Sequence, residues 1–309
     1  MNKDNKGRFM KRFFLFFGIN ILIVATLSIV LSLLGIGSYI EQGKLNLISL
    51  SIFCLVWGMG GAFISLALSK WMAKRMMGIQ IIVPHQAGQY SPILESVHRF
   101  SRQAGLSVMP EVGIYESDEV NAFATGPSKK NSLVAVSTGL IRRMNKDEID
   151  GVLAHEVAHI ANGDMVTMTL IQGIMNAFVM FLARIVAWGI SSAMSKNNDG
   201  EESQSSFSPM INMVIVFVLE IVFGILASIA ISWFSRQREF RADSGGSKLA
   251  GKERMIAALE SLKRTYESLT PQAESSLKTM QISSKNSWLQ LFSTHPSLDD
   301  RIQALKNQF

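Results

Sequence analysis

Long apolar segments limit what this chain can fold into more than any other feature. A helix needs about 20 apolar residues to cross a hydrocarbon core of ~30 Å. Two segments of that length contain no charged residue, and two more contain one each, Arg184 and Glu220. The four spans predicted on this basis are approximately 13–36, 46–69, 165–194 and 210–234. The sequence therefore predicts an α-helical integral membrane protein.

The first predicted span has an alternative interpretation as a cleaved signal peptide. Its uncharged run, residues 13–40, is longer than the usual apolar core of such a peptide, which is about 7–15 residues. No clear small-x-small cleavage site precedes Glu41. A retained membrane anchor is therefore the better interpretation.

Basic residues beside the predicted spans indicate the orientation of the chain. Lys and Arg are enriched before the first span, after the second and after the fourth, whereas the loop between the third and fourth is acidic. Because Lys and Arg concentrate on the cytoplasmic side, both termini and the soluble segments are expected in the cytoplasm. These flanks account for most of the net charge of +6, which therefore implies no nucleic-acid partner. The single cysteine, Cys54, lies within the second span and offers no disulfide framework.

The spans divide the chain into four parts. Residues 1–70 are expected to form two transmembrane helices, and residues 165–234 a transmembrane or membrane-embedded hairpin. Residues 71–164 and 235–309 are expected to form the two parts of one cytoplasmic domain. Strand-like runs occur at 111–115, 121–125 and 133–137. The soluble domain is therefore predicted to be α+β, mostly helical with a small sheet or hairpin.

The most informative motif is HEVAH at residues 155–159. Residues four apart lie on one face of a helix, so His155 and His159 can both reach a single Zn²⁺. Glu156, next to the first histidine, is placed to take a proton from the attacking water. A chance match is the alternative, which makes the helix and a third ligand the features to check.

Signals on both sides of the motif favour a helix. Asn145 and Glu148 match a capping box at its start, and Asn162-Gly163 offers an end. Apolar residues recur between them close to the 3.6-residue period. The metal motif is therefore expected on a buried helix.

The best candidate for the third ligand is Glu239, within residues 236–243. It follows the fourth span by about five residues, and HEVAH ends about six before the third, so both are expected roughly 8–10 Å from one membrane face. Asp243, one helical turn later, is placed to accept a ring N–H from a zinc-bound histidine. A surface carboxylate in a charged helix is the alternative for Glu239 alone.

The two charges inside the later spans are also expected to meet. Arg184 and Glu220 each lie about ten residues from the acidic loop, which places them at one depth in an antiparallel hairpin. Because charges inside a membrane are usually paired or line a cavity, an interhelical ion pair is predicted. The alternative is that both segments lie shallow and both charges contact water.

With these features together, the chain closely resembles the HtpX family of bacterial membrane zinc metallopeptidases, relatives of the eukaryotic CAAX-processing endopeptidase. The resemblance covers nearly the whole length. Its features are the paired N-terminal spans, residues 121–126 (NAFATG), HEVAH, the two later apolar segments, residues 235–243 and residues 294–297.

The resemblance implies a zincin-like fold, one Zn²⁺ per chain bound by His155, His159 and Glu239, and Glu156 as the catalytic residue. It also implies an endopeptidase of the bacterial cytoplasmic (inner) membrane, multi-pass, with its active site facing the cytoplasm. The family acts in the quality control of misfolded or damaged membrane proteins during stress. The expected partners are therefore protein substrates, chiefly membrane proteins, and the lipid bilayer.

Two further segments gain functional interpretations. The residues Asn121, Ala122, Phe123 and Ala124 are expected to form an edge strand to which an extended substrate adds, an ordinary hairpin strand being the alternative. His295 is expected to hydrogen-bond the oxyanion of the reacting peptide, with Arg301 in a weaker role. Helix capping near Ser297 is the alternative explanation of that segment.

Three other protein classes remain as alternatives. A non-catalytic membrane scaffold or holdase needs neither an intact HEVAH nor a third ligand. A transporter that used the charges inside the spans as pathway residues is disfavoured by the large soluble part and by the lack of a Gly/Pro-broken helix pair. An intramembrane protease is disfavoured because the predicted ligands lie outside the apolar runs.

Overall fold

The computed structural model describes residues 44–195, 209–269 and 291–308, together with positions 25–27, 29–30, 32–33 and 40–41. The chain divides into two units. The first contains the described residues up to Ser65 together with Thr169–Ile231, and the second contains Leu66–Met168 and the described residues from Ser232 onward.

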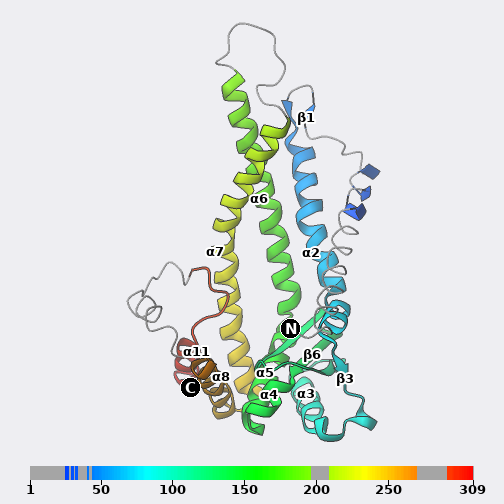
Figure 1. The fold of residues 1–309 in the computed structure, drawn as a ribbon, viewed down its shortest axis with the longest axis vertical. Coiled ribbons are helices and arrows are strands. Elements are labelled where there is room, and N and C mark those ends of the chain that lie inside the picture. Colours follow the sequence, from blue (N-terminus) through cyan, green and yellow to red (C-terminus); the bar gives the residue numbers. More distant parts are fainter. Residues whose placement is uncertain are drawn as a thin grey trace, which may run out of the picture. The chain divides into compact units, whose positions relative to one another are not determined.

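Among the residues that the structure describes, three helices are long and apolar enough to cross a membrane (Figure 1). They are α2 (Leu47–Met77), α6 (Asp164–Ser195) and α7 (Pro209–Ala250), and they contain the predicted second, third and fourth spans. Most of the predicted first span, 13–36, lies outside the described residues. Both α2 and α7 continue well past the predicted span ends, because polar and charged residues after an apolar run do not by themselves end a helix.

Close packing and one ion pair join the helices within the first unit. A Cβ on Gly58 of α2 would lie 2.5 Å from the backbone nitrogen of Ala177 on α6, so only glycine allows this approach. Arg184 Nη1 of α6 lies 2.6 Å from Glu220 Oε1 of α7. The predicted pairing of these two charges is thus present. The first unit also contains two short paired strands, β1 (Ile40–Glu41) and β2 (Lys44–Leu45).

A four-stranded mixed sheet forms one side of the second unit. Its strands are β3 (Gln80–Ile81), β4 (Glu111–Tyr115), β5 (Ala122–Ser128) and β6 (Asn131–Ser137). Their order is β3-β4-β6-β5, with β4 and β6 parallel and the other two pairs antiparallel. The expected mostly helical fold with a small sheet is therefore confirmed. The two-residue strand β3 was not predicted, because it is too short to show alternation.

Alternating side chains place the two faces of the sheet in different cores. On β6, Val134 and Val136 face the main core, which includes Phe100 and Leu153. Leu133 and Ala135 face a smaller cluster that includes the end of α2. Successive side chains of a strand point to opposite faces of its sheet, so β6 contributes to both cores.

Short helices complete the second unit. These are η1 (Pro84–Gln86), η2 (Gly88–Tyr90), α3 (Ser91–Gln103), α4 (Thr138–Arg143), α5 (Lys146–Asn162), α8 (Lys252–Leu269) and α11 (Leu298–Lys306). The start of α5 has the predicted capping box between Asn145 and Glu148, and Gly163 ends it with φ of 75°. Ser297 caps α11 by accepting a hydrogen bond from the backbone N–H of Asp300.

Gly151 allows α5 to pack directly against α8. A Cβ at this position would lie 2.4 Å from the carbonyl oxygen of Arg254 and 2.8 Å from Cβ of Ala258. Because the first contact is with backbone, it cannot be relieved by a side-chain rotation. This close packing fixes the helix that carries HEVAH.

We predict that Gly151→Ala destabilises the protein by about 1–3 kcal/mol through overpacking, even though alanine favours helix by up to ~1 kcal/mol. The measurement is the apparent thermal unfolding midpoint of the detergent-solubilised protein. Gly189→Ala is the matched control, since a Cβ there meets no atom within 4 Å. An unchanged or raised midpoint for Gly151→Ala would contradict the packing argument.

A buried candidate metal centre

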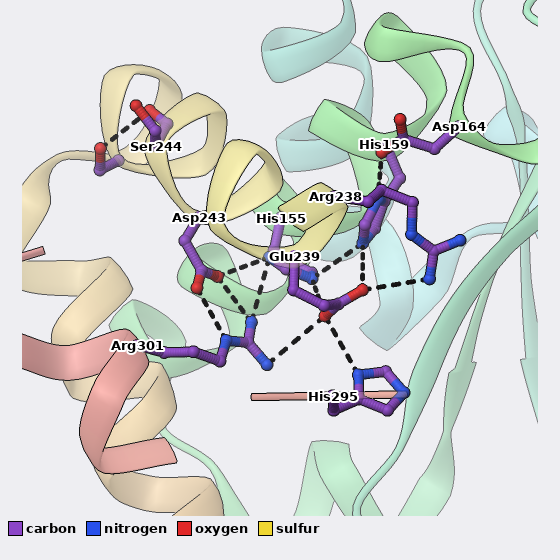
Figure 2. A network of polar contacts seen from close by, with 10 residues as sticks. His155, His159, Asp164, Arg238, Glu239, Asp243, Ser244, His295 and Arg301 are labelled. Carbon is purple, nitrogen blue, oxygen red and sulfur yellow. Dashed lines mark hydrogen bonds and ion pairs between the residues drawn. The ribbon is translucent and has the colours of Figure 1, made fainter. Parts of the chain in front are cut away.

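The two histidines and the glutamate of the predicted metal site lie together in the second unit. α5 supplies His155 and His159, and α7 supplies Glu239 (Figure 2). All three are buried, and one possible ligand atom from each lies within 4.8 Å of the other two. The histidine Nε2 atoms are 3.0 Å apart, and the Glu239 carboxylate oxygens lie 3.4 Å from His159 Nε2 and 3.5 Å from His155 Nε2. Atoms that bind one metal ion tetrahedrally at about 2.0–2.1 Å lie about 3.3 Å apart, so this set fits a metal ion.

Two glycines allow α7 to approach α5 at this point. A Cβ on Gly246 would lie 3.1 Å from the backbone nitrogen of His155 and 3.0 Å from Sδ of Met255. A Cβ on Gly245 would lie 2.8 Å from Cβ of Ala158. The candidate carboxylate ligand sits two turns earlier on α7, so this contact between the helices brings it to the histidines.

The second nitrogen of each histidine faces a carboxylate. His155 Nδ1 is 2.9 Å from Asp243 Oδ1, and His159 Nδ1 is 2.6 Å from Asp164 Oδ2. When Nδ1–H donates to the carboxylate, this hydrogen bond fixes both the tautomer and the orientation of the ring. The lone pair of Nε2 is then available for a metal. The structure thus places Asp243 as the sequence suggested. The contact of Asp164 was not predicted, although its position directly after the helix-ending Gly163 places it within a few residues of His159.

Arg301 of α11 holds the carboxylate behind His155. Its Nε and Nη2 donate to the two oxygens of Asp243 at 2.7 and 2.6 Å. Its Nη1 lies 3.6 Å from Glu239 Oε2, while Arg238 Nη2 lies 3.1 Å from Glu239 Oε1. Figure 2 shows the two arginines reaching Glu239 from opposite sides. Only a weaker role was expected for Arg301, and the contact of Arg238 was not predicted.

The electrostatics of the cluster favour a cation at its centre. Burial lowers the pKa of His155, but hydrogen bonds to Asp243 and Glu239 outweigh burial and raise it. For His159, burial is likewise outweighed by Asp164 and Glu239, and the pKa is raised to about 9. Burial raises the pKa of Glu239, but hydrogen bonds from the histidines hold it well below its usual range. The carboxylates therefore stabilise positive charge at the point that the three candidate ligands face.

A large open cavity adjoins the cluster. Its volume is about 1020 Å³. Glu156 lines it, directly after the first histidine, and so do the residues Asn121, Ala122, Phe123 and Ala124. The last three belong to β5, which pairs only with β6 among the described strands and is an edge of the sheet. The position that the sequence suggested for a substrate strand therefore borders the candidate metal centre.

His295 lies at the same cavity, on the segment that leads into α11. Its Nδ1 is 3.2 Å from Glu239 Oε2, and its side chain is 62% exposed. Ser297, two residues later, caps α11, so capping explains part of this segment but not the position of the imidazole. The predicted ligands, Glu156, His295 and the residues of the proposed substrate strand all line this cavity. Asp243 does not line it, and contacts His155 from behind.

The sequence profile of Peptidase family M48 matches residues 86–308. The chain belongs to this family. Within family M48 it is 48% identical to "Protease HtpX homolog" of Bacillus velezensis over 96% of this chain and 99% of that protein. It is 51% identical to "Protease HtpX" of Shewanella piezotolerans over 96% of this chain and 99% of that protein. These relatives place it in the HtpX group, as the sequence resemblance indicated.

A solved structure shares the fold. Ste24p of S. mikatae matches with a TM-score of 0.64 at 18% identity, over 96% of this chain and 65% of that one. This chain therefore spans just under two thirds of the length of Ste24p, and the likeness shows the fold alone. Family membership and the apolar helices together make this protein a membrane-bound metallopeptidase, and they favour catalysis over a non-catalytic scaffold.

We predict that the affinity of the centre for a divalent metal rises with pH between about 6 and 9. A histidine must be neutral to bind a metal. Because the pKa of His159 is raised to about 9, a proton competes with the metal below that pH and is released as the pH rises. Competition with a chromophoric chelator at several pH values measures the effect. His85→Ala, an exposed histidine outside the cluster, should leave the slope unchanged, and a flat profile would contradict the prediction.

Asp164→Asn should weaken metal binding about 10–100-fold, as is typical when the partner of a metal-binding histidine is altered. The neutral amide of asparagine accepts the Nδ1 proton of His159 more weakly than the charged carboxylate of Asp164 does. The same chelator competition gives the affinity, and Asp118→Asn, an exposed carboxylate elsewhere in the unit, is the control. Equal affinities for the two variants would refute this role of Asp164.

Proposed function

We propose that this protein is a zinc-dependent endopeptidase in which His155, His159 and Glu239 bind the metal and Glu156 is the general base. The observation that carries the proposal is the buried pair of imidazoles and one carboxylate beside an open cavity. Two histidines and one glutamate form a recognised catalytic zinc set, with a position left for water or substrate. When bound there, zinc would supply a Lewis acid that lowers the pKa of water and polarises the scissile carbonyl.

Glu156 is positioned to transfer the proton. Its carboxylate lines the cavity next to His155 and makes no hydrogen bond or ion pair with any other described residue, so its oxygens are available. It takes the proton of the attacking water and delivers it to the amine that leaves when the peptide bond breaks. Its place on α5 supports this role, because Glu156 lies within the same two turns as the two histidines.

The edge strand β5 is proposed to align the substrate. An extended chain can add to a free strand edge through backbone hydrogen bonds. The backbone of Asn121 is already held by Ser137, through Asn121 O at 3.0 Å and Asn121 N at 3.2 Å, which leaves its exposed side chain for the substrate. His295 is proposed to donate a hydrogen bond to the carbonyl oxygen as that oxygen gains negative charge.

The substrates are proposed to be misfolded or damaged membrane proteins, cleaved at the cytoplasmic face of a bacterial inner membrane. The apolar helices support a bilayer location, and the basic flanks beside them support a cytoplasmic orientation. A substrate that is itself in the membrane would present unfolded cytoplasmic segments to the cavity. The printed names of the relatives support proteolysis and leave this substrate class as our inference.

Glu156→Gln should keep the metal and lower kcat on a casein-derived fluorogenic peptide by about 10²–10⁴-fold, the usual contribution of a general base. The glutamine is nearly isosteric but cannot accept the proton. Metal analysis of the purified protein and steady-state kinetics give the two readouts. Glu116→Gln, an exposed glutamate in the same unit, is the control.

A chelator should abolish activity of the unmodified protein, and added Zn²⁺ should restore it. Full activity of Glu156→Gln, or activity that persists without metal, would refute the mechanism.

A further inference from the structure

One face of α7 carries four polar residues in a helical stripe. Ser232, Arg236, Glu239 and Asp243 are spaced by four, three and four residues, so their side chains point to the same side of the helix. The last two belong to the candidate metal centre. The first two have no part in the chemistry proposed above, although they continue the same face.

The first two residues of the stripe hold the backbone of a distant segment. Arg236 Nη1 donates to the carbonyl oxygens of Leu291 and Ser293 at 3.1 and 2.7 Å. Ser232 Oγ donates to the carbonyl oxygen of Phe292 at 3.1 Å. Three consecutive carbonyl groups are thus bound by side chains one turn apart on α7. We call residues 291–297, which continue from this point across the cavity, the strap.

The strap is also fixed at its other end by α7. It leads into α11, whose Arg301 makes the two-pronged contact with Asp243. Within the strap, Ser293 Oγ donates to the carbonyl oxygen of His295 at 2.6 Å, which extends the ordered backbone to the histidine. The same helix therefore holds the segment before and after His295.

The imidazole of His295 has little packing of its own. It is 62% exposed, and its contact with Glu239 is a single one at 3.2 Å. An exposed ring with one polar contact takes its position mainly from the backbone that carries it. That backbone is held by Arg236 and Ser232 on one side and by the Ser297 cap and Arg301 on the other.

We propose that Arg236, assisted by Ser232, is a positioning residue that holds the strap so that His295 faces the reacting carbonyl. This role rests on the proposed function, because it requires His295 to act in peptide hydrolysis. The contacts that carry this role are those of Arg236 with the carbonyl oxygens of Leu291 and Ser293. Its effect on the reaction passes entirely through His295.

The test is a double-mutant cycle with Arg236→Met and His295→Ala. Arg236→Met keeps the apolar stem but removes the donors, and it should lower kcat about 10–100-fold with KM nearly unchanged, as expected when a reacting group is misplaced. Zinc content should not change. Once His295 is absent, Arg236→Met should have little further effect, because residues that act as a unit are not additive. Arg236→Lys, which keeps one cationic donor, should recover part of the activity.

The control is Arg241→Met, an exposed arginine on the same helix, which should leave kcat unchanged. Two independent multiplicative losses in the double variant would overturn the proposal, as would loss of zinc from Arg236→Met.

Hydrogen exchange separates a failure of this inference from a failure of the proposed function. In Arg236→Met the amides of residues 291–297 should exchange about tenfold faster or more, while those of α5 remain protected. This readout needs no catalytic activity. Unchanged exchange in the strap would overturn the proposal even if the protein proves to be a zinc peptidase.

Discussion

The contact between buried carboxylates of α7 and imidazoles of α5 is the interaction on which the rest of the second unit depends. Neither helix can bury its polar groups alone, since an unpaired charge in an apolar interior is strongly unfavourable. His155 meets Asp243 on one nitrogen and Glu239 on the other, and His159 likewise meets Asp164 and Glu239. The glycines on α7 matter for this reason: they set the distance between the helices at which these contacts form.

Around this contact, charges alternate outward from the centre. The imidazoles are flanked by carboxylates, and the carboxylate of Asp243 is in turn held by Arg301, whose pKa is raised by that contact despite burial. Each layer orients the one inside it, so the candidate ligands are fixed before any metal arrives. A catalytic metal centre requires such preorganisation. A ligand that must first rotate into place lowers the affinity for the metal and leaves the geometry of the centre less well defined.

Local sequence signals predicted the parts of this structure that depend on neighbours along the chain. The cap of α5 at Asn145, its end at Gly163 and the cap of α11 at Ser297 each depend on residues within a few positions. Glu239 was found because its distance from an apolar span matched that of HEVAH. The contacts of Asp164, Arg236 and Arg301 were not predicted, since each depends on how separate helices and loops pack, which the periodicity of the sequence does not show. The first predicted span stays a prediction.

The second unit is discontinuous in sequence, because Thr169–Ile231 belongs to the other unit. During synthesis the HEVAH helix therefore emerges long before Glu239, and Asp243 before its partner Arg301, which follows 58 residues later. A chain that ends before Glu239 holds the two histidines but lacks one of the three candidate ligands. The candidate centre can therefore be completed only after the apolar segment between its two parts has been made.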